Sequence, residues 1–195
     1  MKSVAVLIPC LNEEITIGKV IQDFQQSLPD AQIYVFDNNS TDRTAAIAAE
    51  RGATVITELR PGKGKVVESM FRKVEADYYL MVDGDDTYSA EHAPKLLQPL
   101  VEASADMCVA TRLEENSETS FRPLHMFGNN LVRWLVNWIF SSQLRDIMSG
   151  YRAMTAELVR SVPVLSSGFE VETELTIRVL DYGFTIQEVP ITYRE

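Results

Sequence analysis

Two aspartates separated by one glycine follow an apolar run near the middle of the chain. Asp83, Gly84 and Asp85 come directly after residues 79–82, which have the composition of a buried strand. Side chains at i and i+2 of an extended segment point the same way, so the two carboxylates repel each other unless a cation lies between them. Gly84 lets the backbone approach a ligand closely. The spacing therefore predicts a metal site on Asp83 and Asp85; the alternative is an acidic turn that caps a helix.

The chemistry of the two aspartates indicates which metal they would hold. Carboxylate oxygens are hard ligands that suit Mg²⁺ or Mn²⁺, and these ions take their remaining ligands from substrate phosphates and water. We therefore expect a Mg²⁺ or Mn²⁺ cofactor that holds a nucleoside diphosphate. An EF-hand beginning at Asp83 is excluded, because its sixth residue is Tyr88 instead of glycine and its twelfth is Pro94 instead of glutamate.

Other polar residues come where neighbouring apolar runs end, in residues 9–14, 37–40 and 111–112. Ligands of open parallel sheets bind outside the carboxyl ends of the strands. These segments are therefore expected at one edge of a sheet, together with the two aspartates. Asp37 can accept hydrogen bonds from ribose hydroxyls or a base N–H; it can also form an Asx turn into the next helix, and both can hold at once.

A basic, glycine-rich turn, residues 61–65, precedes a predicted helix. It is not a P-loop, because Lys65 is followed by Val66, and it lacks the third glycine of a dinucleotide fingerprint. A helix N-terminus attracts anions, so we expect Lys65 to lie near the phosphates.

The first hundred residues alternate between strand-like and helix-like periods, which predicts an α/β fold with a mostly parallel sheet flanked by helices. Strands are expected over 4–8, 32–36, 54–57, 78–82 and 107–110, and helices over 15–28, 41–51, 65–75 and 93–103. Ser40 or Thr41 is expected to cap the second helix, and Gly52 to follow its end. The remainder predicts a polar loop over 113–121, a helix over 124–140, a turn at 149–150, a helix near 170–182 and a strand over 186–193.

The long predicted helix, 124–140, is apolar almost all round, with one narrow polar stripe formed by Asn130, Arg133 and Asn137. Trp134 and Trp138 lie at i and i+4 on this helix. We expect both to pack in the core; the alternative is a peripheral membrane or subunit contact.

Composition narrows the class of protein. The 195 residues carry a net charge of −10, with 46% hydrophobic and 24% charged residues, as in soluble globular proteins. The negative charge argues against nucleic acid as a partner, because phosphate backbones need Lys/Arg stripes. Cys10 and Cys108 lack metal or disulfide spacing, and neither a signal peptide nor a membrane-spanning run is visible. We expect a cytoplasmic protein, working at the inner face of the membrane if its acceptor is a lipid.

Five motifs give the chain a resemblance over nearly its whole length. Residues 8–13 resemble Ile-Pro-x-x-Asn-Glu, 37–44 Asp-Asp-x-Ser-x-Asp-x-Thr, 62–65 Gly-x-Gly-Lys/Ala, 83–85 Asp-x-Asp, and 146–153 Asp-x-x-Ser-Gly-Phe-Arg-Ala. Together they resemble family 2 glycosyltransferases with the GT-A fold, in the branch of dolichyl-phosphate mannose synthase and bacterial polyprenyl-phosphate glycosyltransferases. The resemblance implies one catalytic domain, 1–195, with a nucleotide-sugar-binding half over 1–112 and an acceptor-binding half over 113–195.

The resemblance also implies roles for single residues. The donor nucleoside would contact Pro9, Leu11, Glu13, Asp37 and Asn39. Beside the metal ligands, the other expected substrate contacts are Lys65, Gly84, Arg112, Arg122, Asn129, Ser149 and Arg152. Of the two arginines at either end of the predicted polar loop, Arg112 would face the transferred group and Arg122 the acceptor phosphate. Glu172 best matches the position of a catalytic base; the alternative is a solvated acid in the first turn of its helix.

Some positions depart from the family pattern. Thr87 stands where relatives often have a glutamine that ligates the metal, and Met126 where a serine is expected. Asn38 replaces the second of two aspartates. Relatives continue beyond Glu195 with a basic segment and often with transmembrane helices, so we expect a truncated chain.

These observations predict an inverting, metal-dependent transfer of a sugar from a UDP- or GDP-sugar to a lipid-linked acceptor, polyprenyl phosphate. The alternatives are transfer to a saccharide hydroxyl and a non-catalytic sugar-nucleotide-binding protein. A nucleotidyltransferase would need a glycine-rich, arginine-bearing turn at residues 10–14, which this chain lacks. The identity of the sugar and a homo-oligomeric state stay open.

Overall fold

The computed structural model describes residues 2–112, 123–168 and 170–192, with the side chains of 112 and 123–129 excepted. Seven strands form one sheet in the order β3-β2-β1-β4-β6-β5-β7. Their bounds are β1 (Val4–Cys10), β2 (Gln32–Asp37), β3 (Thr54–Thr57), β4 (Tyr78–Met81), β5 (Met107–Arg112), β6 (Arg152–Thr155) and β7 (Ile186–Ile191). Every neighbouring pair is parallel except the two that include β6. The predicted mostly parallel α/β sheet is confirmed.

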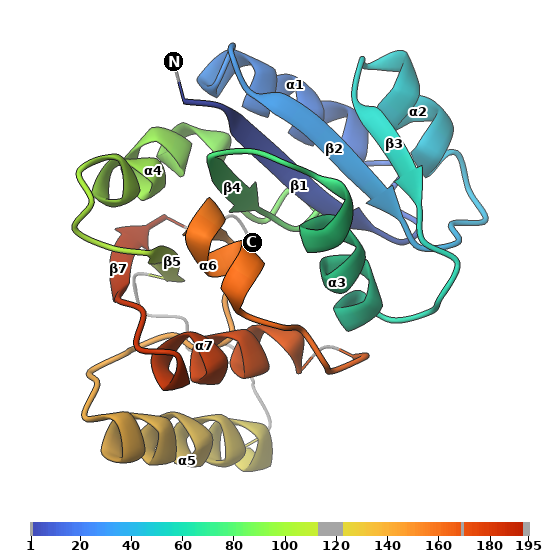
Figure 1. The fold of residues 1–195 in the computed structure, drawn as a ribbon. Coiled ribbons are helices and arrows are strands. Elements are labelled where there is room, and N and C mark those ends of the chain that lie inside the picture. The colour runs from blue at the N-terminus through green and yellow to red at the C-terminus, as the bar shows by residue number, and fades with distance from the viewer. Residues whose placement is uncertain (1, 113–122, 169, 193–195) are drawn as a thin grey trace.

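Helices cover both faces of the sheet (Figure 1). On one face lie α1 (Ile17–Ser27), α2 (Thr44–Glu50) and α4 (Ala93–Val101), and on the other α3 (Lys63–Lys73), α6 (Ala156–Ser161) and α7 (Val171–Asp181). Successive side chains of β1 point to opposite faces of the sheet, so the strand contributes to both cores. Val6 and Ile8 pack with the first group of helices, and Ala5 and Leu7 pack with the second. A 3₁₀ turn, η1 (Ala90–His92), precedes α4. Both cysteines are buried thiols in this core, as predicted.

Two elements in the second half were not predicted, β6 and α6. β6 has four residues and carries Arg152, whose side chain is fully buried, so it shows no alternation of apolar and polar residues. α6 has six residues and is capped by Thr155, whose hydroxyl accepts from the Leu158 N–H. Both are too short for a periodic signal, although β6 joins the two halves of the sheet.

The predicted start of α2 was wrong by one turn. α2 begins at Thr44 instead of Thr41, because the Asp42 carboxylate accepts from the Thr44 N–H at 2.9 Å and holds the preceding residues in a turn. Ser40 does not cap this helix; its hydroxyl accepts from the Asn12 N–H instead. Gly52 follows the helix with φ of 82°, which confirms its predicted place.

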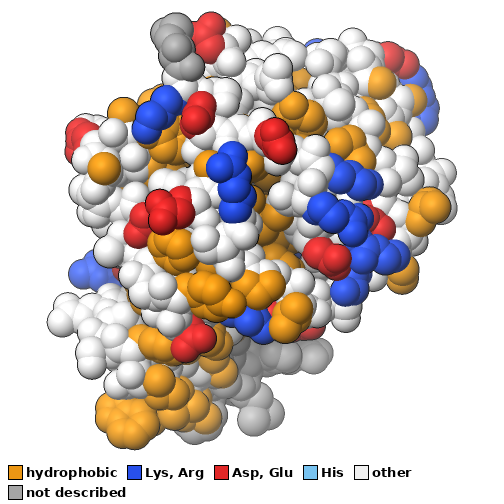
Figure 2. All heavy atoms as spheres, viewed as in Figure 1, with side chains coloured by type: hydrophobic (Ala, Val, Ile, Leu, Met, Phe, Trp, Pro, Cys, Tyr) orange, Lys and Arg blue, Asp and Glu red, His pale blue; other side chains and the backbone are white. Residues whose placement is uncertain are grey.

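Helix α5 (Pro123–Phe140) lies outside α7 (Figure 1). Two residues of the polar stripe bind the segment that follows the helix: Asn137 donates to the Leu144 carbonyl and Arg133 to the Arg145 carbonyl. Trp134 and Trp138 point outward with 59% and 70% exposure, so the prediction of core packing was wrong. Figure 2 shows hydrophobic side chains gathered over α5 at the lower edge of the molecule.

Along the described ranges, no helix is both long and apolar enough to cross a bilayer.

Candidate active site at the carboxyl edge of the sheet

β1, β2 and β4 end at the same edge and bring the predicted site segments together. The Asn38 N–H donates to the Cys10 carbonyl at 2.9 Å, which joins the ends of β2 and β1. The Thr16 hydroxyl donates to the Gly84 carbonyl at 2.7 Å, which ties the segment after β4 to the start of α1. A Cβ on Gly84 would meet the Cys10 sulfur at 2.8 Å, so Gly84 is required by close packing here. The predicted convergence of these segments is therefore seen.

The turns after β1 and β2 are joined by reciprocal hydrogen bonds. Asn12 donates its N–H to the Ser40 hydroxyl at 2.9 Å, and its side chain accepts from the Thr41 N–H at 2.8 Å. The Glu13 N–H donates to the Thr44 hydroxyl at 2.8 Å. These bonds fix the first turn rigidly against the second. Beside them Pro9 is half-buried, whereas Leu11 is 53% exposed and presents an apolar surface to solvent.

Asp37 is the buried acid of this edge. Its residue exposure is 6%, and its Oδ2 accepts from the Ser40 N–H at 3.4 Å. Its Oδ1 is buried and has no hydrogen-bond partner among the described residues. An unpaired buried carboxylate oxygen is costly, so a donor supplied by a ligand is the expected partner.

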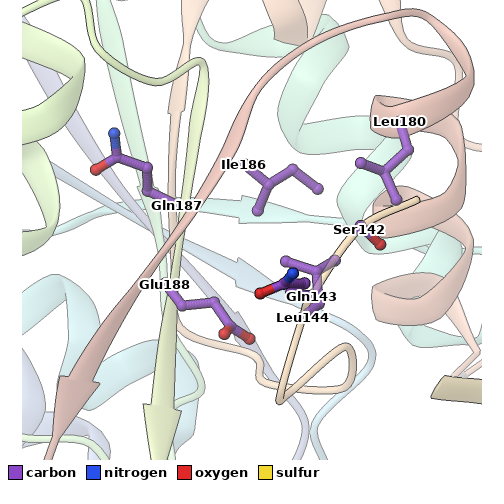
Figure 3. Close-up of a pocket in the computed structure, with 7 residues that line it drawn as sticks. All are labelled: Ser142, Gln143, Leu144, Leu180, Ile186, Gln187 and Glu188. Carbon is purple, nitrogen blue, oxygen red and sulfur yellow. The ribbon is translucent and has the colours of Figure 1, made fainter. Parts of the chain in front are cut away.

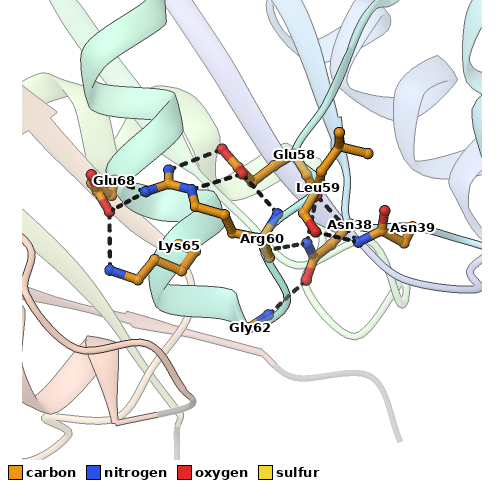
Figure 4. A network of polar contacts seen from close by, with 8 residues as sticks. All are labelled: Asn38, Asn39, Glu58, Leu59, Arg60, Gly62, Lys65 and Glu68. Carbon is orange, nitrogen blue, oxygen red and sulfur yellow. Dashed lines mark hydrogen bonds and ion pairs between the residues drawn. The ribbon is translucent and has the colours of Figure 1, made fainter.

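Asn38 and Asn39, which follow this acid in the sequence, hydrogen-bond to the loop after β3 (Figure 4). Asn38 is buried; its Nδ2 donates to the carbonyls of Glu58 and Arg60 at 2.7 and 2.8 Å, and its Oδ1 accepts from the Gly62 N–H at 2.9 Å. Only an amide can both donate and accept in this way, which explains the departure from aspartate. Asn39 donates to the Leu59 carbonyl at 3.1 Å, so it helps to hold the same loop.

Asp83 lies between a lysine and a glycine. The Lys63 ammonium lies 2.6 Å from its Oδ1, and a Cβ on Gly150 would collide with its carboxylate. The Asp83 side chain is 25% exposed. It is therefore held in one place while one side stays open to solvent.

The same ammonium also contacts Glu172, at the start of α7. The distance from Lys63 Nζ to Glu172 Oε1 is 2.5 Å, and the Glu172 side chain is only 7% exposed. Burial lowers the pKa of Lys63, but the Asp83 and Glu172 carboxylates outweigh it and the net pKa is raised. Glu172 is thus not the solvated first-turn acid that was the alternative in the sequence.

Asp85 lies two residues after Asp83 and is oriented by Thr87. Its Oδ1 accepts from the Thr87 hydroxyl at 2.6 Å and from the Thr87 N–H at 3.1 Å. Partial burial and the nearby Asp85 carboxylate raise the pKa of Glu13, which shows that negative charge concentrates here. Thr87 therefore holds the Asp85 carboxylate in place.

The carboxylate oxygens at this edge are of the ligand type that a divalent cation such as Mg²⁺ prefers. Asp83 and Asp85 offer hard oxygen ligands at a concentration of negative charge. Over the described part of the chain, no group of three or more His, Cys, Asp or Glu side chains is arranged to hold a metal on its own. Two carboxylates without a third protein ligand suit an ion that completes its coordination with phosphate and water.

Two predicted site residues are interior. Arg152 is fully buried, and its guanidinium donates to the carbonyls of Ser149 and Ile147 and to the Thr176 hydroxyl, each at 2.8 Å. Ser149 is also fully buried. Both fix the turn that presents Gly150 to Asp83, so a direct contact with substrate would need this turn to open.

Of the four remaining predicted residues, the structure describes only the side chain of Lys65. Lys65 lies 3.3 Å from Glu68 on its own helix. Arg112 ends β5 and Asn129 belongs to α5, but their side chains lie outside the described set, as does Arg122 entirely. The loop predicted over 113–121 also lies outside it.

A separate hollow of about 410 Å³ lies between the segment after α5, helix α7 and the start of β7 (Figure 3). Leu144, Leu180 and Ile186 form its apolar part, and Gln187 and Glu188 add polar groups. Because it adjoins the beginning of a parallel strand, it lies at the opposite edge of the sheet from Asp83, where ligands of such sheets do not usually bind.

Comparison with known proteins gives the family of the chain. Residues 5–160 match the family model for "Glycosyl transferase family 2". The chain belongs to glycosyltransferase family 2. This glycosyltransferase is 51% identical over 123 residues to "Protein RfbJ" of Shigella flexneri, an alignment that covers 63% of this chain and 95% of RfbJ.

Archaeal relatives align along nearly the whole glycosyltransferase. "Glycosyltransferase AglJ" of Haloferax volcanii is 36% identical over 98% of this chain, which spans 63% of AglJ. "Dolichyl-phosphate hexose transferase" of the same organism is 32% identical over 98% of this chain and 82% of its own length.

Among solved structures, glucosyl-3-phosphoglycerate synthase from Mycobacterium tuberculosis in complex with UDP superposes with a TM-score of 0.83 at 25% identity, covering 100% of this glycosyltransferase and 72% of that chain. The same enzyme with Mn²⁺, UDP and glucosyl-3-phosphoglycerate gives a TM-score of 0.82 at 25% identity and the same coverage. The predicted GT-A fold is therefore confirmed.

Sequence reasoning missed Lys63 in this glycosyltransferase. Both lysines of the 61–65 turn were visible, but the predicted helix began at Lys65, whereas α3 begins at Lys63. With the helix starting at Lys63, the Lys63 side chain contacts Asp83 and the Lys65 side chain contacts Glu68. The sequence signal for Lys63 was the pair of glycines that flank it, because glycine is typical of positions where another group packs closely against the backbone.

Proposed function

We propose that this family 2 glycosyltransferase moves a hexose, with inversion, from a UDP- or GDP-sugar to polyprenyl phosphate, with Mg²⁺ or Mn²⁺ as cofactor. The observation that carries the proposal is the convergence of Asp37, Asp83 and Asp85 at one edge, with a buried Asp37 oxygen left for a ligand donor. Binding of Mn²⁺ and UDP-glucose by glucosyl-3-phosphoglycerate synthase supports the donor and the metal.

Each part of the edge has a distinct task in this proposal. Asp37 and Asn39, with Pro9, Leu11 and Glu13, would bind the nucleoside, and Asp83 and Asp85 would hold the cation. When bound, the cation would neutralise the charge that develops on the departing nucleoside diphosphate. Thr87 and Gly150 orient the two aspartates before the ligand arrives, so little rearrangement is needed at the moment of reaction.

A phosphate acceptor would react without a strong base in the protein. Its oxygen is already an anionic nucleophile, so the protein has to bind and orient it. Arg112 and Arg122 would do so, because guanidinium groups match phosphate geometry. The 32% identity to a dolichyl-phosphate hexose transferase supports an acceptor of this class.

The exposed face of α5 supports a lipid-linked acceptor. Leu131, Trp134, Leu135, Trp138 and Ile139 are all exposed, and the two tryptophan rings stack at 6.2 Å. A helix with an apolar, tryptophan-bearing face can lie in a membrane interface. The net charge of −10 points to contact through apolar burial more than through attraction to anionic lipid.

A hydroxyl acceptor is the second candidate, and Glu172 is the observation that favours it. A saccharide hydroxyl would need a base, and the Glu172 carboxylate is linked to Asp83 through Lys63. The 37% identity over 98% of this chain to "Low-salt glycan biosynthesis hexosyltransferase Agl6", of which the chain spans 48%, is compatible with either acceptor.

Calorimetry with UDP and GDP in the presence of Mn²⁺ tests the donor site. Asp85→Asn should abolish metal-dependent nucleotide binding and leave thermal unfolding unchanged, because Asp85 is exposed. Unchanged nucleotide affinity in this variant would remove the metal role from Asp85.

Transfer assays then separate the acceptors. Arg122→Ala should spare nucleotide binding and lose transfer to polyprenyl phosphate, whereas Glu172→Gln should lose transfer only to a hydroxyl acceptor. For the α5 face, the double variant Trp134→Ser, Trp138→Ser should bind less to phosphatidylcholine vesicles; equal sedimentation with vesicles would contradict membrane contact.

A further inference from the structure

We propose that Lys63 is a positioning residue that competes with the divalent cation for Asp83, so that cation and nucleoside diphosphate bind cooperatively. The inference rests on the metal role proposed for Asp83. It assigns to the lysine a task that the donor and acceptor contacts do not include.

The ammonium of Lys63 already contacts one oxygen of the Asp83 carboxylate. It lies 2.6 Å from Asp83 Oδ1 and 2.5 Å from Glu172 Oε1, and the exposures of the three side chains are 15%, 25% and 7%. One positive charge thus bridges two carboxylates away from bulk water, where charge interactions are stronger than at an exposed surface. A divalent ion binding to Asp83 would have to displace this ammonium or bear its repulsion.

The backbone that delivers Lys63 is fixed, so the exchange has to come from the side chain. The Gly62 N–H donates to Asn38 Oδ1 at 2.9 Å, and Gly62 has φ of 111°. A Cβ on Gly62 would collide with the Ser167 carbonyl oxygen, and one on Gly64 with that of Ser166. The start of α3 is therefore packed directly onto the loop that leads to Glu172.

Charge balance explains how the diphosphate would favour the exchange. Two carboxylates and one ammonium leave a net charge of −1 in this group, which binds one cation moderately and disfavours an anion. A nucleoside diphosphate brings negative oxygens that attract Lys63 away from Asp83, and the vacated carboxylate then accepts the cation. Each ligand therefore improves the affinity of the other, as binding linkage requires.

Titration of Mn²⁺ alone into the full chain tests the competition directly. Lys63→Met removes the ammonium and keeps an unbranched apolar stem, so Mn²⁺ should bind about tenfold tighter than to the wild type. A lysine that only contacts the donor would leave the affinity for Mn²⁺ alone unchanged. Lys73→Met is the matched control, since this exposed lysine ends the same helix and its loss changes the net charge equally.

Calorimetry with UDP, with and without Mn²⁺, measures the cooperativity. The ratio of the two UDP affinities should shrink in Lys63→Met and stay at the wild-type value in Lys63→Arg, which keeps the charge. If Lys63→Met fails to fold, Lys63→Gln takes its place, because glutamine can donate to Asp83 without a charge.

The outcomes distinguish this inference from the proposed function. Equal or weaker Mn²⁺ binding in the neutral Lys63 variant overturns the competition, and so does the absence of Mn²⁺ binding in both proteins. If nucleotide binding remains dependent on Mn²⁺ and Asp85 while Lys63→Met behaves as wild type, the metal site stands and only the role of Lys63 falls.

Discussion

The carboxylate of Asp83 fills the space that a side chain at Gly150 would occupy. The two residues come from separate elements, since Asp83 follows β4 and Gly150 precedes β6. β4 and β6 are antiparallel neighbours, and Met81 is paired with Arg152, so the carboxyl end of one strand meets the start of the other. The position of the predicted metal ligand thus depends on a glycine that is distant in the sequence.

Gly150→Ala should displace Asp83 without unfolding the chain. Gly150 has no positive φ, so the obstacle is space alone, and the colliding atoms belong to the Asp83 side chain. We expect a loss of about 1–3 kcal/mol in the free energy of unfolding, as for other overpacked sites. Affinity for UDP with Mn²⁺ should fall strongly, measured by calorimetry. Full affinity in a destabilised variant would show that Asp83 is not needed in its observed place.

Asp37→Asn should weaken nucleotide binding while the fold is kept. The change retains the size of the side chain but removes the charge from the buried Oδ1, which has no partner among the described residues. A hydrogen bond to a charged group contributes about 1.5–3 kcal/mol, so the affinity for UDP or GDP should fall about ten- to hundredfold. Asp30→Asn, on an exposed loop, is the control and should bind as wild type. Equal affinities in the two variants would remove Asp37 from the nucleoside site.

Acid should weaken the loop that carries Lys63. Hydrogen bonds from the Arg60 side chain and N–H lower the pKa of the buried Glu58 from 4.5 to about 2. Because the folded pKa is depressed, this stabilisation is present above pH 4.5 and is lost as the pH falls toward 2. Arg60→Met should therefore lower stability at pH 7 and flatten the acid dependence, measured by urea denaturation at a series of pH values.

Arg43→Met is the matched control for this experiment. Arg43 pairs with Glu50, but both side chains are more than 60% exposed, at 69% and 64%. Exposed pairs contribute little, so the control should reproduce the wild-type acid dependence. A wild-type profile in Arg60→Met as well would contradict the assignment of the acid-sensitive stability to Glu58.

The parts of the fold that could be predicted are those with a strong period or a strong motif. The strand before Asp83 was found from its continuous apolar run, and the amphipathic α1 from the helical spacing of its apolar residues. Both were predicted within two residues of their observed ends. β6 could not be found, since it is short and its buried Arg152 depends in part on the hydroxyl of Thr176, which is distant in the sequence. Its place depends on tertiary contacts.

Orientation was harder to predict than secondary structure. α5 was predicted as a helix, but most of its residues are apolar, so its sequence did not indicate which face packs against the protein. Asn137 donates a hydrogen bond to the segment after the helix. Likewise, the sequence alone did not indicate whether Lys63 or Lys65 would contact Asp83. Only the packing of Gly62 and Gly64 on the loop before α7 decides which ammonium reaches Asp83.

Asn38→Asp should destabilise the chain, even though aspartate is the residue expected from the family resemblance. The Asn38 amide donates to the carbonyls of Glu58 and Arg60, and a carboxylate would place negative charge against both oxygens. Losing these donors at a buried site should cost about 1–3 kcal/mol of unfolding free energy, measured by urea denaturation at pH 7. Asn39→Asp, at an exposed position with longer hydrogen bonds of 3.1 and 3.4 Å, is the control and should cost less. Equal stability of Asn38→Asp and wild type would show that the loop before Lys63 is held by other contacts.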